Sequence, residues 1–160
     1  MPRIVFLCTK NQFRSPLAAE ILKKELAARG VPGLWNVDSV GSWVKDLATA
    51  TPDALREAAK RGLDLSSHTS KGIEAIQRDK IDLLLVMEQG QKESLLLEFP
   101  NLRKKTFLLS ELSGANYSIP DPYVTGEPCD EIAFEIEQLV QNNIDTIIGL
   151  ALGIRPRAKD

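Results

Sequence analysis

Apolar residues along the chain fall into two kinds of segment that alternate. Short runs of consecutive apolar and β-branched residues are typical of strands buried on both faces of a sheet. These predicted strands cover residues 3–7, 34–40, 81–87 and 105–109. Between them, apolar residues recur every three or four positions, as they do on one face of a helix. The corresponding predicted helices cover residues 15–29, 51–60, 70–78, 91–98 and 127–152.

The ends of two helices carry clear local signals. Ser15 is a good N-cap, Pro16 suits the first helical position, and Gly30 is typical of the residue that follows a helix. Thr51, followed directly by a proline, predicts the start of the next helix, and Gly62 its end. The residues between Cys8 and Arg14 therefore form a turn that leads from the first strand into the first helix.

Strands that alternate with helices predict an α/β fold with a parallel sheet. We expect a single three-layer domain, a four-stranded parallel sheet flanked by helices, of the flavodoxin-like type. The length of 160 residues suits one domain, at residues 1–153, with a loose polar tail at 154–160. In such sheets ligands bind beyond the carboxyl ends of the strands, which is where Cys8 lies.

Composition excludes several classes of protein. A net charge of −2 gives no basis for nucleic-acid binding or a basic membrane face. The apolar run at residues 83–87 is too short to span a bilayer, and the first residues lack the apolar core of a signal peptide. Two cysteines do not make a disulfide framework, so we expect a cytoplasmic protein. With His68 as the single histidine, neither a metal nor another cofactor is expected.

The turn CTKNQFRSP carries the first chemical signal. Its backbone N–H groups and the positive end of the following helix face one point, which stabilises a thiolate at Cys8 and binds a phosphate-like dianion. The planar fork of Arg14 matches two phosphoryl oxygens. Together these features predict phosphoryl transfer to sulfur. The residues expected to bind phosphate are Thr9, Lys10, Asn11, Gln12, Phe13 and Arg14.

Two further residues of this turn have predicted supporting roles. The amide of Asn11 would hold the turn in shape, and the hydroxyl of Ser15 would hydrogen-bond Cys8 and make sulfur a better leaving group. The alternative interpretation is a buried structural cysteine, which is the usual role of a lone cysteine. The position of Cys8 at the end of the first strand, directly before a capped helix, favours the chemical interpretation.

The segment SIPDPYVTG supplies a candidate proton donor for the leaving group. Asp121 stands between two prolines that stiffen the loop, and Tyr123 would line the wall of a pocket. The alternative is an ordinary Pro-Asp-Pro turn. Beside the cysteine turn, the interpretation of Asp121 as an acid is favoured.

CTKNQFRSP, the Asp121-Pro122-Tyr123 segment about 110 residues later and the chain length together resemble the low-molecular-weight protein tyrosine phosphatase family, over roughly residues 2–152. Residues 38–43 and 62–68 resemble further segments of that family. The resemblance implies that Cys8 is the nucleophile, Arg14 the phosphate clamp and Asp121 the general acid, later the base. It also implies a network that supports the loop and two pocket walls. The network residues are Asn11, Ser15, Ser39 and His68, and the walls are Trp43 and Tyr123.

The loop departs from the family pattern at two positions. Lys10 stands where glycine is usual, so that it either strains the cradle or adds positive charge at the mouth of the site. Phe13 stands where a second cysteine is usual. Without that cysteine, oxidised Cys8 has no disulfide partner in the loop and is predicted to proceed to irreversible acids.

The predicted function is hydrolysis of phosphomonoesters through a phosphocysteine, on a phosphorylated protein or a small phosphomonoester. The choice between phosphotyrosine and phosphoarginine stays open, and Gln12 bears on it. One alternative is thiol-coupled arsenate reduction, which needs more relay cysteines than Cys129 alone. Another is a non-catalytic member that binds phosphate or a phosphoprotein. A monomer and a weak dimer are both compatible with the sequence.

Overall fold

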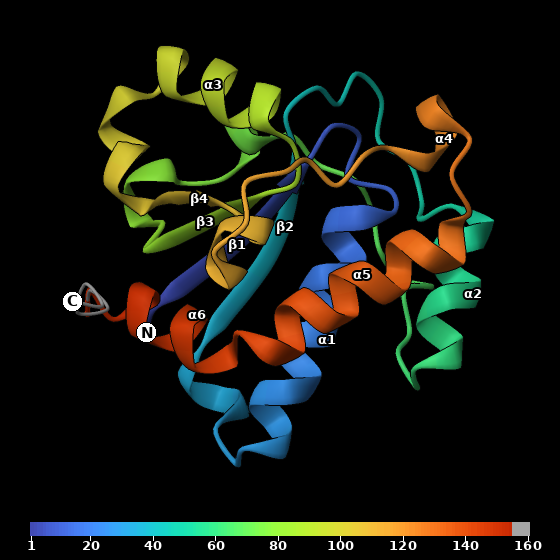
Figure 1. Ribbon diagram of the computed structural model, residues 1–160, viewed down its shortest axis with the longest axis horizontal. Coiled ribbons are helices and arrows are strands. Elements are labelled where there is room, and N and C mark those ends of the chain that lie inside the picture. Colours follow the sequence, from blue (N-terminus) through green and yellow to red (C-terminus); the bar gives the residue numbers. More distant parts are fainter. Residues whose placement is uncertain (155–160) are drawn as a thin grey trace.

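Four parallel strands form the centre of the protein (Figure 1). In the computed structural model, which describes residues 1–154, the strands lie in the order β2-β1-β3-β4. Their bounds are β1 Arg3–Cys8, β2 Asn36–Gly41, β3 Leu83–Val86 and β4 Thr106–Leu108. The predicted α/β class and parallel sheet are confirmed.

Helices cover both faces of this sheet, as Figure 1 shows for α3 on one side and α1 and α5 on the other. Because β1 is central and covered twice, it reads as an unbroken apolar run. Ile4 and Phe6 pack into the cluster beneath α1 and α5, whereas Val5 and Leu7 pack into the cluster beneath α3. The helices are α1 Arg14–Ala28, α2 Pro52–Lys60, α3 Gln89–Glu98, α4 Pro122–Thr125, α5 Cys129–Asn142 and α6 Ile144–Ala151.

The start of α1 differs from the prediction. The helix begins at Arg14, its N-cap is Phe13, and no side chain caps it. Ser15 is not the N-cap, because its hydroxyl is engaged by Cys8 and Asn11 instead. Pro16 is the third helical residue rather than the first. Proline is tolerated there because the first four N–H groups of a helix have no partner within it.

The predicted helix at residues 70–78 is wrong. The segment forms two short 3₁₀ turns, η2 Ile73–Ala75 and η3 Arg78–Lys80. Backbone pairing with the end of β2 keeps its start extended, since the N–H of Gly41 donates to the carbonyl of Lys71 at 2.8 Å. A contact distant in sequence therefore overrides the helical spacing of the apolar residues.

The predicted helix at residues 127–152 is two helices, α5 and α6, separated at Asn143. The Asn143 amide donates to the carbonyl of Leu139 at 2.7 Å and to the hydroxyl of Ser113 at 2.8 Å, and so replaces the helical partner of that carbonyl. Apart from Ile154, the predicted tail at 154–160 lies outside the described residues. Within residues 1–154, no helix is long and apolar enough to cross a membrane.

Candidate active site

A cavity of about 270 Å³ opens at the carboxyl end of the sheet, above the loop that joins β1 to α1. The loop places its backbone at the amino end of the 15-residue helix α1, where partial positive charge favours an anion. The lining residues come from three distant parts of the chain: Cys8, Lys10, Gln12, Phe13, Arg14, Thr51, Asp121 and Tyr123.

Asn11 fixes the shape of this loop. It is fully buried and is the non-glycine residue with a positive φ, 57°, in the described part of the chain. Its amide nitrogen donates to the hydroxyls of Ser15 (2.8 Å) and Ser39 (2.9 Å), and its amide oxygen accepts from the N–H of Lys71 at 3.0 Å. The carbonyl of Asn11 accepts from Nε2 of His68 at 2.7 Å, so this nitrogen carries the proton. Four residues predicted to support the loop are therefore brought together behind it.

Lys10 does not take the left-handed conformation, which belongs to its neighbour Asn11. Lys10 therefore has no positive-φ strain. The strained conformation is taken by Asn11, and asparagine tolerates it better than most residues. The Lys10 side chain is exposed and lines the cavity. Of the two interpretations of Lys10, added positive charge at the mouth of the site therefore fits the structure.

Cys8 lies at the base of the cavity with 2% of its surface exposed. Its Sγ is 3.0 Å from the hydroxyl oxygen of Ser15. That hydroxyl accepts from Asn11 and has one proton, which can go to the Val40 carbonyl at 3.3 Å or to the nearer Cys8 sulfur. A thiolate can only accept, so it would draw this proton. The arrangement stabilises negative charge on sulfur.

Arg14 is held between carboxylates. Its Nη1 donates to Oε2 of Glu88 at 2.9 Å and to the carbonyl of Ile119 at 2.8 Å, while Nη2 lies 3.8 Å from Oδ2 of Asp121. Only 3% of the Arg14 side chain is exposed. A buried guanidinium with fixed neighbours presents its remaining donors in one orientation, which suits bidentate binding of phosphate.

Glu88 and Gln91 contact residues of the site, and sequence reasoning did not single them out. Gln91 donates to Oε2 of Glu88 at 2.8 Å and to the Thr9 hydroxyl at 2.9 Å, which links the arginine partner to the loop. The position of Glu88 in the sequence could have indicated it. Glu88 follows β3 closely and is the N-cap of α3, so it lies at the same edge of the sheet as Cys8.

Asp121 is the N-cap of α4, where its Oδ1 accepts from the N–H of Tyr123 at 2.9 Å. The chain just before Asp121 is also fixed, because the N–H of Ile119 donates at 2.8 Å to the carbonyl of Met87, the residue that follows β3. These contacts direct the second carboxyl oxygen of Asp121 towards Arg14 and the cavity.

Phe13 and Tyr123 form an aromatic wall. Their rings meet edge to face, with centroids 6.2 Å apart and an interplanar angle of 88°. The Tyr123 hydroxyl donates to Oδ2 of Asp53 at 2.7 Å, and Asp53 also pairs with Arg56. Burial raises the pKa of Tyr123, and the hydrogen bond from Tyr123 lowers the pKa of Asp53. The sequence did not single out Asp53, because an acidic residue in the first turn of α2 is already explained by its favourable interaction with the helix dipole.

Trp43 and Thr9 do not line the cavity. The Trp43 side chain points to solvent, with 65% of the residue exposed, while the backbone N–H of Trp43 donates to the carbonyl of Thr9 at 3.0 Å. Gly41 makes this close approach possible, since a Cβ there would lie 2.6 Å from the Thr9 carbonyl oxygen. Trp43, which was predicted to form a pocket wall, thus contacts the loop through its backbone, but it does not line the cavity.

A buried thiol at the base of an anion-binding loop, an arginine fixed beside it and a carboxyl group above define a cysteine-dependent phosphatase. Residues 3–148 match the family model "Low molecular weight phosphotyrosine protein phosphatase". The chain belongs to this family.

Relatives and solved structures agree with this assignment. The chain is 29% identical over 147 residues to a protein-arginine-phosphatase of Geobacillus stearothermophilus, covering 91% of this chain and 90% of that one. It is 30% identical over 142 residues to a probable low molecular weight protein-tyrosine-phosphatase, EpsP, of Ralstonia nicotianae, covering 89% and 90%. The crystal structure of a low molecular weight protein tyrosine phosphatase from T. tengcongensis superimposes with a TM-score of 0.82 at 29% identity, covering 91% and 99%.

Proposed function

We propose that the chain hydrolyses phosphomonoesters in two steps through a phosphocysteine. In the first step the Cys8 thiolate attacks phosphorus, the bond from phosphorus to the leaving oxygen breaks, and Asp121 gives that oxygen a proton. In the second step water attacks phosphorus, Asp121 takes a proton from the water, and the sulfur–phosphorus bond breaks to return the thiolate. Inorganic phosphate leaves.

One observation carries the proposal: Cys8, Arg14 and Asp121, from three separate elements, line the same cavity of about 270 Å³. The loop N–H groups and Arg14 would hold the non-bridging oxygens as charge develops on them. Ser15, 3.0 Å from the sulfur, would stabilise the departing thiolate in the second step. A pure phosphate-binding protein has no chemical need for the thiol or for the carboxyl group.

We further propose a phosphorylated protein as the substrate, with phosphotyrosine favoured over phosphoarginine. The aromatic wall of Phe13 and Tyr123 supports a flat aromatic leaving group, and Lys10 supports a doubly charged phosphate. Relatives of this chain are named for both activities. The free thiols of Cys8 and Cys129 support a reducing location in the cytoplasm, where the protein would act as a monomer or weak dimer.

The test is hydrolysis of p-nitrophenyl phosphate at mildly acidic pH by the parent chain and by Cys8→Ser, Asp121→Ala and Cys129→Ser. We expect no turnover with Cys8→Ser, a sharp loss of kcat with Asp121→Ala and parent activity with Cys129→Ser. Rates on peptides with phosphotyrosine or phosphoarginine then decide the substrate class. A parent chain that binds vanadate without turning over substrate would be a binding protein, and the proposal would be wrong.

A further inference from the structure

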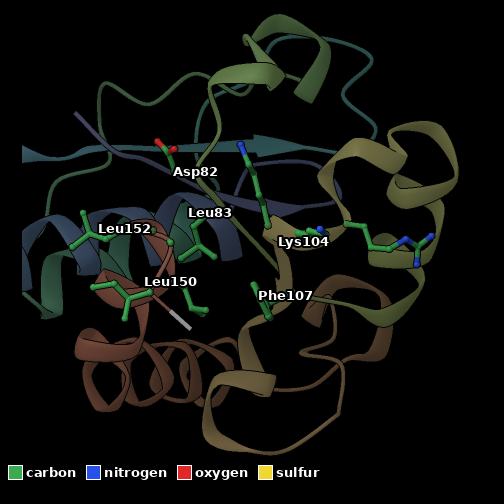
Figure 2. Close-up of a pocket in the computed structure, with 11 residues that line it drawn as sticks. Asp82, Leu83, Lys104, Phe107, Leu150 and Leu152 are labelled. Carbon is green, nitrogen blue, oxygen red and sulfur yellow. The ribbon is translucent and has the colours of Figure 1, made fainter. Parts of the chain in front are cut away.

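A second cavity, of about 680 Å³, opens at the other end of the sheet (Figure 2). It lies where β3 and β4 begin, with Leu83 as the first residue of β3 and Phe107 on β4. The strands are parallel, so this cavity is separated from Cys8 by the length of the sheet. It shares no lining residue with the cavity at Cys8.

The floor and one wall of this second cavity are apolar. Leu83 is fully buried, and Phe107 lines the same cavity from the neighbouring strand (Figure 2). The end of α6 and the residues after it contribute Leu150 and Leu152, and Leu152 is 53% exposed. A ligand with an apolar body would cover the exposed part of Leu152 and remove this apolar surface from water, which favours binding.

The opposite wall is cationic. Arg103, Lys104 and Lys105 end the 3₁₀ turn η4 (Pro100–Lys105) and line the cavity. Lys105 is engaged, since its Nζ donates to the carbonyl of Ile81 at 2.8 Å. Arg103 and Lys104 have no ion-pair partner among residues 1–154. Their charge is available for an anionic group.

The one carboxylate in the lining, Asp82, offsets one of the three cationic side chains, so the lining keeps a net charge of +2. Its Oδ2 accepts from the backbone N–H of Arg3 at 2.8 Å. The sequence after Ile154, RPRAKD, carries three cationic side chains and one acidic side chain. Its charge has the same sign as that of the cationic wall, so electrostatics do not favour this segment as the occupant.

We propose that this cavity binds a small anionic amphiphile, with its acidic group at Arg103 and Lys104 and its apolar body against Leu83, Phe107, Leu150 and Leu152. The volume lies in the range of roughly 300–1,000 Å³ that is usual for small-ligand sites. A carboxylate and a phosphate head group share the required chemistry. The site is distinct from the phosphatase site, and the inference does not depend on the proposed hydrolysis.

Calorimetric titration of the full chain with dodecanoate, below its micelle concentration, tests this inference. We expect saturable binding of one molecule and an increase in Kd of at least about fivefold in the double variant Arg103→Gln/Lys104→Gln. Lys23→Gln/Lys45→Gln, with the same change of net charge elsewhere, should leave Kd unchanged. Dodecylphosphonate, an anionic amphiphile with no ester bond for the Cys8 site to hydrolyse, should also bind, whereas dodecyltrimethylammonium should not.

The apolar wall is tested with Leu152→Glu, which should abolish binding, against Leu97→Glu, an equally drastic change at a more exposed leucine on α3. The inference would be overturned if dodecanoate bound equally well to the parent chain, to Arg103→Gln/Lys104→Gln and to Leu152→Glu. Equal binding of the cationic amphiphile would overturn it as well. A dimer in sedimentation that only Leu152→Glu dissociates would identify a second copy as the occupant. Binding that appears only after residues 155–160 are deleted would identify that segment instead.

Discussion

Glu88 accepts a hydrogen bond from Nη1 of Arg14 at 2.9 Å, while Asp121 lies 3.8 Å from Nη2 of the same guanidinium. The arginine that would bind phosphate therefore sits between two carboxylates from different loops. One of them is the proposed acid, and the other has no evident role in the chemistry itself. Glu88 is best understood as the residue that fixes the direction of the Arg14 fork.

Removing this partner should weaken catalysis. We expect Glu88→Ala to lower kcat/KM for p-nitrophenyl phosphate by about 10–100-fold, since a hydrogen bond to a charged group contributes roughly 1.5–3 kcal/mol. Glu88→Gln keeps one acceptor oxygen and should lose less. Glu93→Gln, on the exposed face of α3, is the control. Unchanged kinetics in Glu88→Ala would show that the Ile119 carbonyl alone suffices to hold Arg14.

Loss of the Ser15 hydroxyl should slow the second chemical step more than the first. Ser15→Ala removes the donor 3.0 Å from the Cys8 sulfur, so the thiolate becomes a poorer leaving group. One hydrogen bond to a charged sulfur predicts a decrease in kcat of roughly tenfold or more, with accumulation of phosphoenzyme. Rapid-quench kinetics would show a burst in Ser15→Ala, and Ser67→Ala, an exposed serine, should behave as the parent. If Ser15→Ala showed no burst, the Ser15 hydroxyl would not act in the hydrolysis of the phosphoenzyme.

Asn11 should contribute to folding as well as to the site. Asn11→Ala removes three side-chain hydrogen bonds and leaves alanine at a φ of 57°. We expect a loss of about 2–4 kcal/mol in the free energy of unfolding. Urea denaturation followed by tryptophan fluorescence measures it, with Asn116→Ala, at an exposed position, as the control. A loss below about 1 kcal/mol would contradict a structural role for the network.

The Tyr123–Asp53 contact should make stability depend on pH. The hydrogen bond from Tyr123 is the largest cause of the lowered pKa of Asp53, followed by the pair with Arg56. A lowered pKa in the folded state means that this stabilisation is present above the pKa of the unfolded chain, about 3.9, and is lost as pH falls through the folded value.

Tyr123→Phe should therefore lower stability at neutral pH by about 1 kcal/mol or less, because Asp53 is partly exposed. The difference between parent and variant should shrink as pH falls from about 5 to about 3. Unfolding curves at a series of pH values measure it, and Tyr117→Phe, at a tyrosine whose hydroxyl interacts with Glu135 rather than with Asp53, is the control. A difference that stays constant with pH would mean that Tyr123 acts only through packing on Phe13.

Oxidation should inactivate the chain irreversibly. The loop contains no second cysteine, and Phe13 occupies its place against Tyr123. After mild peroxide we expect Cys8 to reach sulfinic or sulfonic acid, so that dithiothreitol restores little activity. Phe13→Cys should recover activity with reductant, because it supplies a disulfide partner. Cys129→Ser should behave as the parent, and a difference there would identify Cys129 as a partner. Intact-mass spectra report each product.

Local sequence was sufficient for the elements that carry the chemistry. The apolar run of β1, the cysteine at its end and the helix that follows are set by neighbouring residues, so Cys8 and Arg14 were singled out as candidates without a structure. Asp121 was found because prolines on both sides make its loop conspicuous. The four-stranded parallel sheet followed from the alternation of strands and helices.

What sequence could not supply were the contacts between distant segments. Nothing local to Glu88 indicates that its carboxylate meets Arg14, 74 residues away. The break at Asn143 and the extended segment at Lys71 likewise depend on Ser113 and on the end of β2. Sequence determined which residues are chemically competent, because that depends on side-chain type and local conformation. The tertiary structure alone decided which of them meet, because the order of the strands brings their carboxyl ends together.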